Sequence, residues 1–177
     1  MALITALLLL IVVTIMALSM FRSYGIQERI AGNTRDKQRA INAAESAQQY
    51  AEYWLTSTAA PSAAVCGVGM VPDSVGQVCS NGLANPASVP WAGYVGYTQF
   101  TANGGNGVTN TVNATTPTAG SYYQPPGFYI TDLGPNAGTP GEVYQIDAVG
   151  YGGTANTVAV VESTFLITSG TAKDPNK

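Results

Sequence analysis

The side chains that could carry chemistry in this chain are few and scattered. Cys66 and Cys79 are its two cysteines, and the sequence contains no histidine. Without histidine, the usual Ser-His and Cys-His arrangements for nucleophilic catalysis cannot form. Asp73, Asp132 and Asp147 lie too far apart along the sequence to predict a calcium site, so we expect them to be solvated surface groups. We therefore expect no catalytic residue, no metal site, no cofactor and no enzymatic activity.

The two cysteines are separated by twelve residues. A disulfide closing this loop would stabilise the fold by about 3 kcal/mol. The alternatives are two free thiols or half of a metal site, although the spacing matches no zinc pattern. We predict the disulfide, which places the chain in an oxidising compartment.

Charge is distributed unevenly along the sequence. Five of the seven basic residues lie between positions 22 and 39, and the other two are in the C-terminal tail. Residues 40–172 contain no lysine or arginine but seven carboxylates. A nucleic-acid-binding protein needs a basic surface that neutralises phosphates. We therefore expect no nucleic-acid partner.

Residues 1–21 form an apolar run without a charge. As a helix this run would span roughly 31 Å, close to the roughly 30 Å core of a bilayer. It is suited to lipid or to the dry interior of a protein assembly. A signal peptide is the weaker interpretation because nothing basic precedes the run. A single-span anchor conflicts with the positive-inside rule. The basic residues that follow the run would belong in the cytoplasm, whereas the rest of the chain is expected outside it. A basic leader before Met1, since removed, would resolve this conflict.

The order of elements predicts an α+β fold with one long helix. No proline occurs from Met1 to about Thr56, and the second half of this stretch has apolar residues at helical spacing. We expect an apolar half-helix at 1–25, an amphipathic half-helix at 26–60 and a β-rich head at 61–177.

The head is predicted to contain an antiparallel sheet of about four strands that packs on the helix. A disulfide-pinned irregular loop is expected at 62–92, and a Thr/Asn/Gly-rich surface excursion follows the first strand. The last strand is apolar on both faces, which favours a central position in the sheet. The expected strands are Tyr94–Phe100, Gly127–Leu133, Glu142–Tyr151 and Thr157–Thr168.

A specific resemblance covers about residues 1–55. Residues 28–47 read ERIAGNTRDKQRAINAAESA. This segment, after an apolar helix, resembles the N-terminal region of PilX-type pilus assembly proteins. Ile30 stands where the family usually has methionine, and Ser46 precedes Ala47. The resemblance implies a type IV pilin-like fold, in which the helix packs on an antiparallel sheet.

The resemblance also implies how the chain would be processed and assembled. A prepilin peptidase would remove a basic leader, and the new N-terminus at Met1 would be methylated. Before assembly the chain would reside in the inner membrane, and the pilus assembly machinery would then place it among copies of itself or other pilins. The apolar half-helix would enter the filament core through Leu3, Ile4, Thr5, Leu7, Leu8, Ile11, Val12 and Ile15.

The rank of the subunit in the filament stays open. Most principal pilins carry glutamate at the fifth mature residue, where this chain has Thr5. The chain could be a minor, accessory pilin or a principal one, supporting adhesion, aggregation or motility at the cell surface. The alternative is a membrane-anchored extracytoplasmic binding module.

Two further sets of residues are candidates for surface contacts. Charged residues just after the apolar run form either a solvated helix face or an interface between subunits, and with the resemblance we favour the interface: Glu28, Arg29, Arg35, Asp36 and Arg39. Asn113 lies in an N-glycosylation sequon. The Thr/Ser-rich loop around it could equally take O-linked sugars, and a chance occurrence of the sequon is about as common as either modification.

Overall fold

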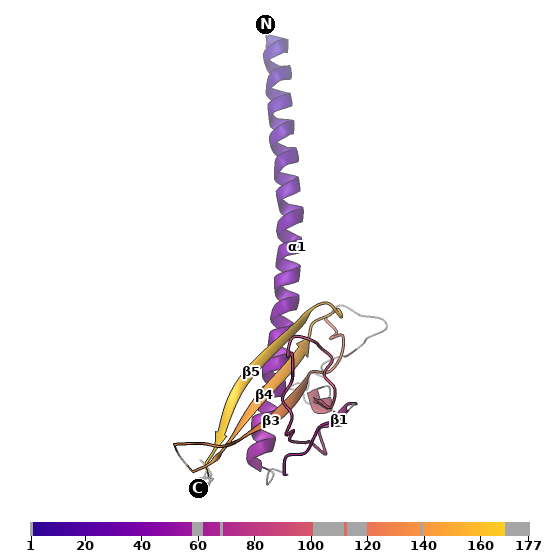
Figure 1. Cartoon of the computed structure of the whole chain (residues 1–177). Helices are drawn as coiled ribbons and strands as arrows, with labels where there is room; N and C mark the ends of the chain where they lie inside the picture. The colour runs from indigo at the N-terminus through magenta and orange to yellow at the C-terminus, as the bar shows by residue number, and fades with distance from the viewer. Residues whose placement is uncertain are drawn as a thin grey trace, which may run out of the picture. The chain divides into compact units, whose positions relative to one another are not determined.

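The computed structural model describes residues 2–57, 62–67, 69–100, 112, 120–138 and 140–168, without the side chains of Arg22 and Ser23. The chain forms two compact units, residues 1–36 and 37–177. Its elements are the helix α1 (Ala2–Ser57), the strands β1 (Val71–Pro72) and β2 (Val95–Gly96), the 3-10 helix η1 (Thr98–Phe100), and the strands β3 (Gly127–Pro135), β4 (Glu142–Tyr151) and β5 (Val158–Ile167) (Figure 1). The predicted α+β class and the single long helix are confirmed.

The sheet is mixed and has five strands in the order β1-β2-β3-β4-β5. β2 to β5 pair antiparallel, whereas β1 pairs parallel with β2 through Val71 and Val95. The prediction of about four antiparallel strands missed β1, which lies in the stretch expected to be irregular. Two paired residues are too few to show an alternating pattern in a sequence.

The first predicted strand is also much shorter than expected. Only Val95–Gly96 is extended, and Thr98–Phe100 turns into η1. Asp73 explains this turn, because its carboxylate accepts hydrogen bonds from the Thr98 hydroxyl (2.8 Å) and the Gln99 amide (3.0 Å). Asp73 is therefore buried, contrary to the expectation of a solvated group.

The expectation of a central last strand is wrong, because β5 lies at an edge of the sheet. Its two faces are apolar because each is partly covered, and not because it has neighbours on both sides. Phe165 and Ile167 pack with the cluster beneath α1, and Val158 and Val160 pack with a second cluster on the opposite face. A sequence pattern reports burial of the faces and does not report the number of paired neighbours.

Alanines on α1 allow the helix to lie very close to the sheet. Ala40, Ala43, Ala44, Ala47 and Ala51 are all buried. They recur at three- and four-residue intervals, so they share one face of the helix.

The facing residues of β4 become smaller along the strand. Tyr144, Ile146 and Ala148 are buried on one face, as their period-two spacing predicts, and Gly150 continues this face. A Cβ atom at Gly150 would lie 2.2 Å from the Ala40 carbonyl oxygen and 2.3 Å from the Ala44 nitrogen. The helix backbone thus occupies the space that a side chain at residue 150 would need.

Candidate assembly interface

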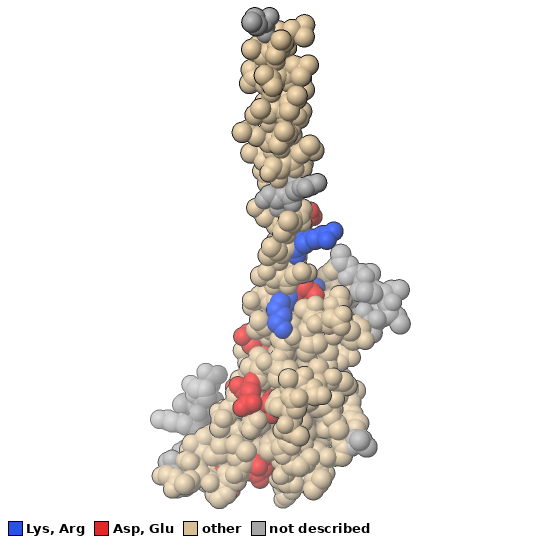
Figure 2. All heavy atoms as spheres, turned by 45° about the horizontal axis from the view of Figure 1, so that its top comes forward, with Lys and Arg blue, Asp and Glu red and all other residues tan. Residues whose placement is uncertain are grey.

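The first unit presents an apolar helical surface. Seven of the eight residues predicted for a filament core are large apolar residues, with exposed fractions between 44 and 79 % (Leu3, Ile4, Leu7, Leu8, Ile11, Val12 and Ile15). On the face drawn in Figure 2, the N-terminal end of α1 shows neither basic nor acidic side chains. By length and composition α1 could cross a membrane. Its most apolar 18-residue stretch has a mean hydropathy of 2.8, and none of this stretch is buried.

Two threonines in this surface bond within the helix. The hydroxyl of Thr5 donates to the carbonyl oxygen of Ala2 (2.9 Å), and that of Thr14 donates to the carbonyl oxygen of Ile11 (2.8 Å). A hydroxyl that bonds to its own helix needs no outside partner in a dry environment. Thr5 is therefore compatible with burial in lipid or protein. Met1 lies outside the described residues, so its predicted methylation stays a prediction.

The charged residues predicted for a subunit interface differ in their surroundings. Glu28, Arg29 and Arg35 are exposed on the helix, and Asp36 is half-buried. Arg39 instead binds the head of its own chain. Its guanidinium donates to the carbonyl oxygens of Gly120 (2.6 Å) and Ser121 (2.8 Å) and lies over the Tyr122 ring, 4.4 Å from the ring centre.

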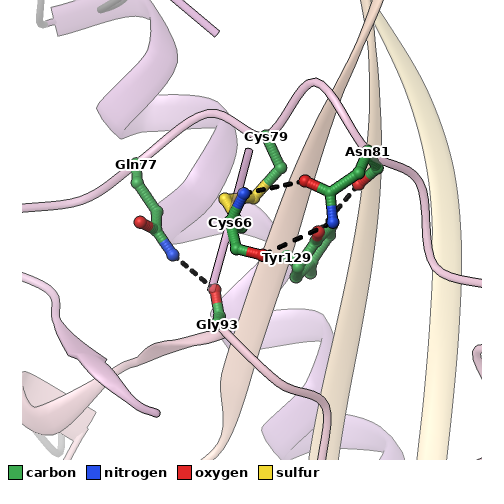
Figure 3. The surroundings of a disulfide bond; sticks show 6 residues. All are labelled: Cys66, Gln77, Cys79, Asn81, Gly93 and Tyr129. Atoms are coloured by element: carbon green, nitrogen blue, oxygen red, sulfur yellow. Dashed lines mark hydrogen bonds between the residues drawn. A yellow bond between two sulfur atoms is a disulfide. The ribbon is translucent and has the colours of Figure 1, made fainter. Parts of the chain in front are cut away.

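Cys66 and Cys79 form a disulfide, as the sequence predicts, with 5.3 Å between their Cα atoms. Cys79 extends the sheet beside β3: its amide donates to the Ile130 carbonyl oxygen, and its carbonyl oxygen accepts from the Asp132 amide, both at 2.8 Å. The Asn81 side chain holds the other half of the bridge by accepting from the Cys66 amide (2.8 Å) (Figure 3). The Tyr129 hydroxyl donates to the Asn81 carbonyl oxygen (2.7 Å). The disulfide loop thus covers the edge of β3 that the short β2 leaves open.

Replacing both cysteines with serine should lower the free energy of unfolding of the head by about 3 kcal/mol, because the unfolded chain gains conformational freedom. Hydrogen exchange should accelerate at the backbone amides of position 79 and Asp132, which bond at this edge. Dithiothreitol should destabilise the wild-type chain to the same extent and leave the double variant unchanged. Equal chemical-denaturation midpoints for the variant and the wild type would contradict this role.

Asp147 is also buried, contrary to the expectation of a surface group. It lies within β4, between Tyr129 of β3 and Glu162 of β5 in register. Its Oδ2 accepts from the side-chain amide of Gln145 (3.1 Å), whereas its Oδ1 has no hydrogen-bond partner among the described residues. Burial raises the pKa of this carboxyl from 3.8 to about 6, with a smaller contribution from the Glu162 carboxylate. Its place in a strand was the one sequence signal of this burial.

An Asp147→Asn variant should have a flatter dependence of stability on pH than the wild type. The folded state holds the Asp147 proton more tightly than the unfolded state, so its stabilising effect is complete below pH 4 and is lost as pH rises through about 6. Two pKa units correspond to about 3 kcal/mol. The free energy of unfolding of the variant, measured relative to the wild type, should therefore be higher at pH 7 than at pH 4 by up to this amount. Urea denaturation at both pH values measures the gain. Glu142→Gln, at an exposed position of the same strand, is the control and should show little change.

The comparisons with known proteins concern the helix. Residues 1–49 match the PilX N-terminal family model. The predicted resemblance of the N-terminal portion to PilX-type proteins is therefore confirmed, and it supports a protein related to type IV pili. No curated protein and no solved structure was found to match the chain. The match ends within α1, so it does not extend to the head.

Proposed function

We propose that this chain is a structural subunit of a type IV pilus-like surface filament. Its apolar half-helix holds the chain in the inner membrane before assembly and then enters the filament core beside copies of itself or other pilins. The head forms part of the outer surface, where it supports adhesion, aggregation or motility. Its role is structural and needs no cofactor.

The exposed apolar surface of residues 2–21 is the observation that carries this proposal. Burying such side chains gains about 25 cal/mol for each Å² removed from water, so they require either lipid or protein around them. In the PilX-like portion, one helix carries both this surface and the buried alanines that pack on the sheet. A lipid-exposed anchor alone would not need the family-specific charged segment that follows.

The chain is processed, in this proposal, by a prepilin peptidase and methylated at Met1. Glu28, Arg29, Arg35 and Asp36 contact neighbouring subunits. Arg39 has contacts within its own head that occupy its guanidinium, so its part in an interface is secondary. Thr5 and the PilX match favour an accessory subunit over a principal one. Asn113 lies outside the described residues and stays a candidate glycosylation site.

The second candidate is a membrane-anchored binding module, which the length and hydropathy of α1 also allow. Cell fractionation distinguishes the two functions. A pilus subunit should be recovered in surface fibres sheared from intact cells, with a further pool in the inner membrane. Recovery of the chain in the membrane alone would support the anchored module and contradict the filament.

A further inference from the structure

A groove of about 690 Å³ lies on the head, on the sheet face opposite α1. One wall is the loop around Pro86 and Val89, and the other is formed by Val158, Val160 and Glu162 of β5. The walls are mostly apolar, and Glu162 supplies a carboxylate. This combination suits a long cationic side chain, whose methylene stem packs on apolar residues while its charged end meets the carboxylate.

The loop that forms the first wall is held in place by hydrogen bonds. Its Asn85 side chain accepts from the Ala87 amide (3.1 Å), and its Asn85 carbonyl oxygen accepts from the Ser88 amide (3.0 Å). The indole of the buried Trp91 donates to the Pro86 carbonyl oxygen (2.9 Å). A wall ordered in advance lowers the entropic cost of binding.

The carboxylates beside the groove have few cations of their own chain to balance them. Glu162 lies directly opposite the buried Asp147, whose Oδ1 has no hydrogen-bond partner in the part of the chain that the structure describes. Residues 40–172 contain no lysine or arginine. Lys37 donates to the Val158 carbonyl oxygen, at the start of β5. Four residues of strand, about 13 Å, separate that position from Glu162.

The same chain carries exposed arginines elsewhere. Arg29 and Arg35 are exposed on α1, in the other compact unit of the chain. Their charge is complementary to that of the groove, and a planar guanidinium can pair with a carboxylate through two hydrogen bonds.

We propose that the groove receives an arginine, Arg29 or Arg35, from a second copy of this chain. This inference rests on the proposed filament. The groove and the arginines are different surfaces, so the contact is not self-complementary. Repeating such a contact generates a closed ring or, where the rotation between copies does not close, an open helical assembly, whereas a self-complementary contact would stop at a dimer.

Charge exchange tests the contact in fibres sheared from cells that express the variants. Glu162→Lys should reduce the amount of this chain in the fibres about tenfold, because it places like charges together. Combining it with Arg29→Glu or with Arg35→Glu gives two double variants, and one of these should regain incorporation into the fibres. Glu162→Gln, which keeps the side-chain size, should give a smaller loss.

Glu142→Lys is the matched control, because Glu142 is an exposed carboxylate on β4 that does not line the groove. Thermal unfolding of each variant establishes that the head is folded. Equal incorporation of the Glu162→Lys and Glu142→Lys variants would overturn the contact, as would the failure of both double variants to restore it. Absence of the wild-type chain from fibres would overturn the proposed function itself, and with it this contact.

Discussion

An Ile11→Asp variant is expected to reduce the amount of this chain in sheared surface fibres by roughly 100-fold, while the unfolding temperature of its head stays unchanged. Ile11 is 44 % exposed in the isolated chain, so the folded subunit does not depend on it. In a filament core the introduced carboxylate would be buried without a partner, at a cost of several kcal/mol per subunit. Each 1.4 kcal/mol corresponds to a tenfold change in an equilibrium constant.

The matched control is Ile30→Asp. Ile30 is 59 % exposed on the same helix but lies among the charged residues of the 28–39 segment. The same substitution should therefore cost much less there. The membrane pool of both variants should be measured in parallel, because an aspartate also disfavours membrane insertion, by about 3 kcal/mol at the bilayer centre. A normal amount of the Ile11→Asp variant in fibres would refute burial of this residue in a core.

A Gly150→Val variant should destabilise the head by about 3 kcal/mol, which corresponds to a fall in unfolding temperature of about 10 °C. The new side chain would begin 2.2 Å from the Ala40 carbonyl oxygen and 2.3 Å from the Ala44 nitrogen. Both obstacles are backbone atoms of α1, so the side chain cannot be accommodated by a change of rotamer. The helix must move away from β4, which separates the buried alanines from the sheet.

Gly138→Val is the control for this substitution. A Cβ atom at Gly138 would meet no heavy atom of the described residues within 4 Å, so valine there should change the unfolding temperature by only a few degrees. Thermal unfolding followed by circular dichroism compares the two variants. Equal unfolding temperatures for Gly150→Val and Gly138→Val would mean that the helix and β4 do not lie as close as the structure describes.

The helix and the three long strands could be predicted from the sequence because their signals are local. The run without proline predicted α1, and period-two alternation predicted the face of Tyr144, Ile146 and Ala148. The disulfide followed from the two cysteines and their short separation. The helix and the strand faces depend on residues that are close in the sequence, and two cysteines allow only one disulfide, so the sequence alone indicates all of these features.

The features that were missed depend on tertiary contacts. The edge position of β5 and the parallel pairing of β1 depend on which strands meet, and the alternation of residues contains no such information. The burial of Asp73 depends on hydrogen-bond donors 25 and 26 residues away in the sequence. The groove beside Glu162 likewise requires a loop that is more than 70 residues distant in the sequence.

The composition of the proposed assembly site could be predicted from the sequence, but the surface proposed to receive it could not. The residues of the apolar half-helix were identifiable from hydropathy and from the PilX-like segment that follows. The surface on the head that we propose meets a neighbouring copy was not, because Glu162 is a lone carboxylate in an apolar strand when read as sequence. Its significance comes from the groove and from Asp147 opposite it.

Electron cryomicroscopy of fibres sheared from the cell surface tests the central claim most directly. If this chain is a filament subunit, the density should contain its head on the outside and residues 2–21 packed against neighbouring helices in a core that holds no lipid. Fibres whose density lacks this chain, with the chain recovered instead from the inner membrane, would contradict the account.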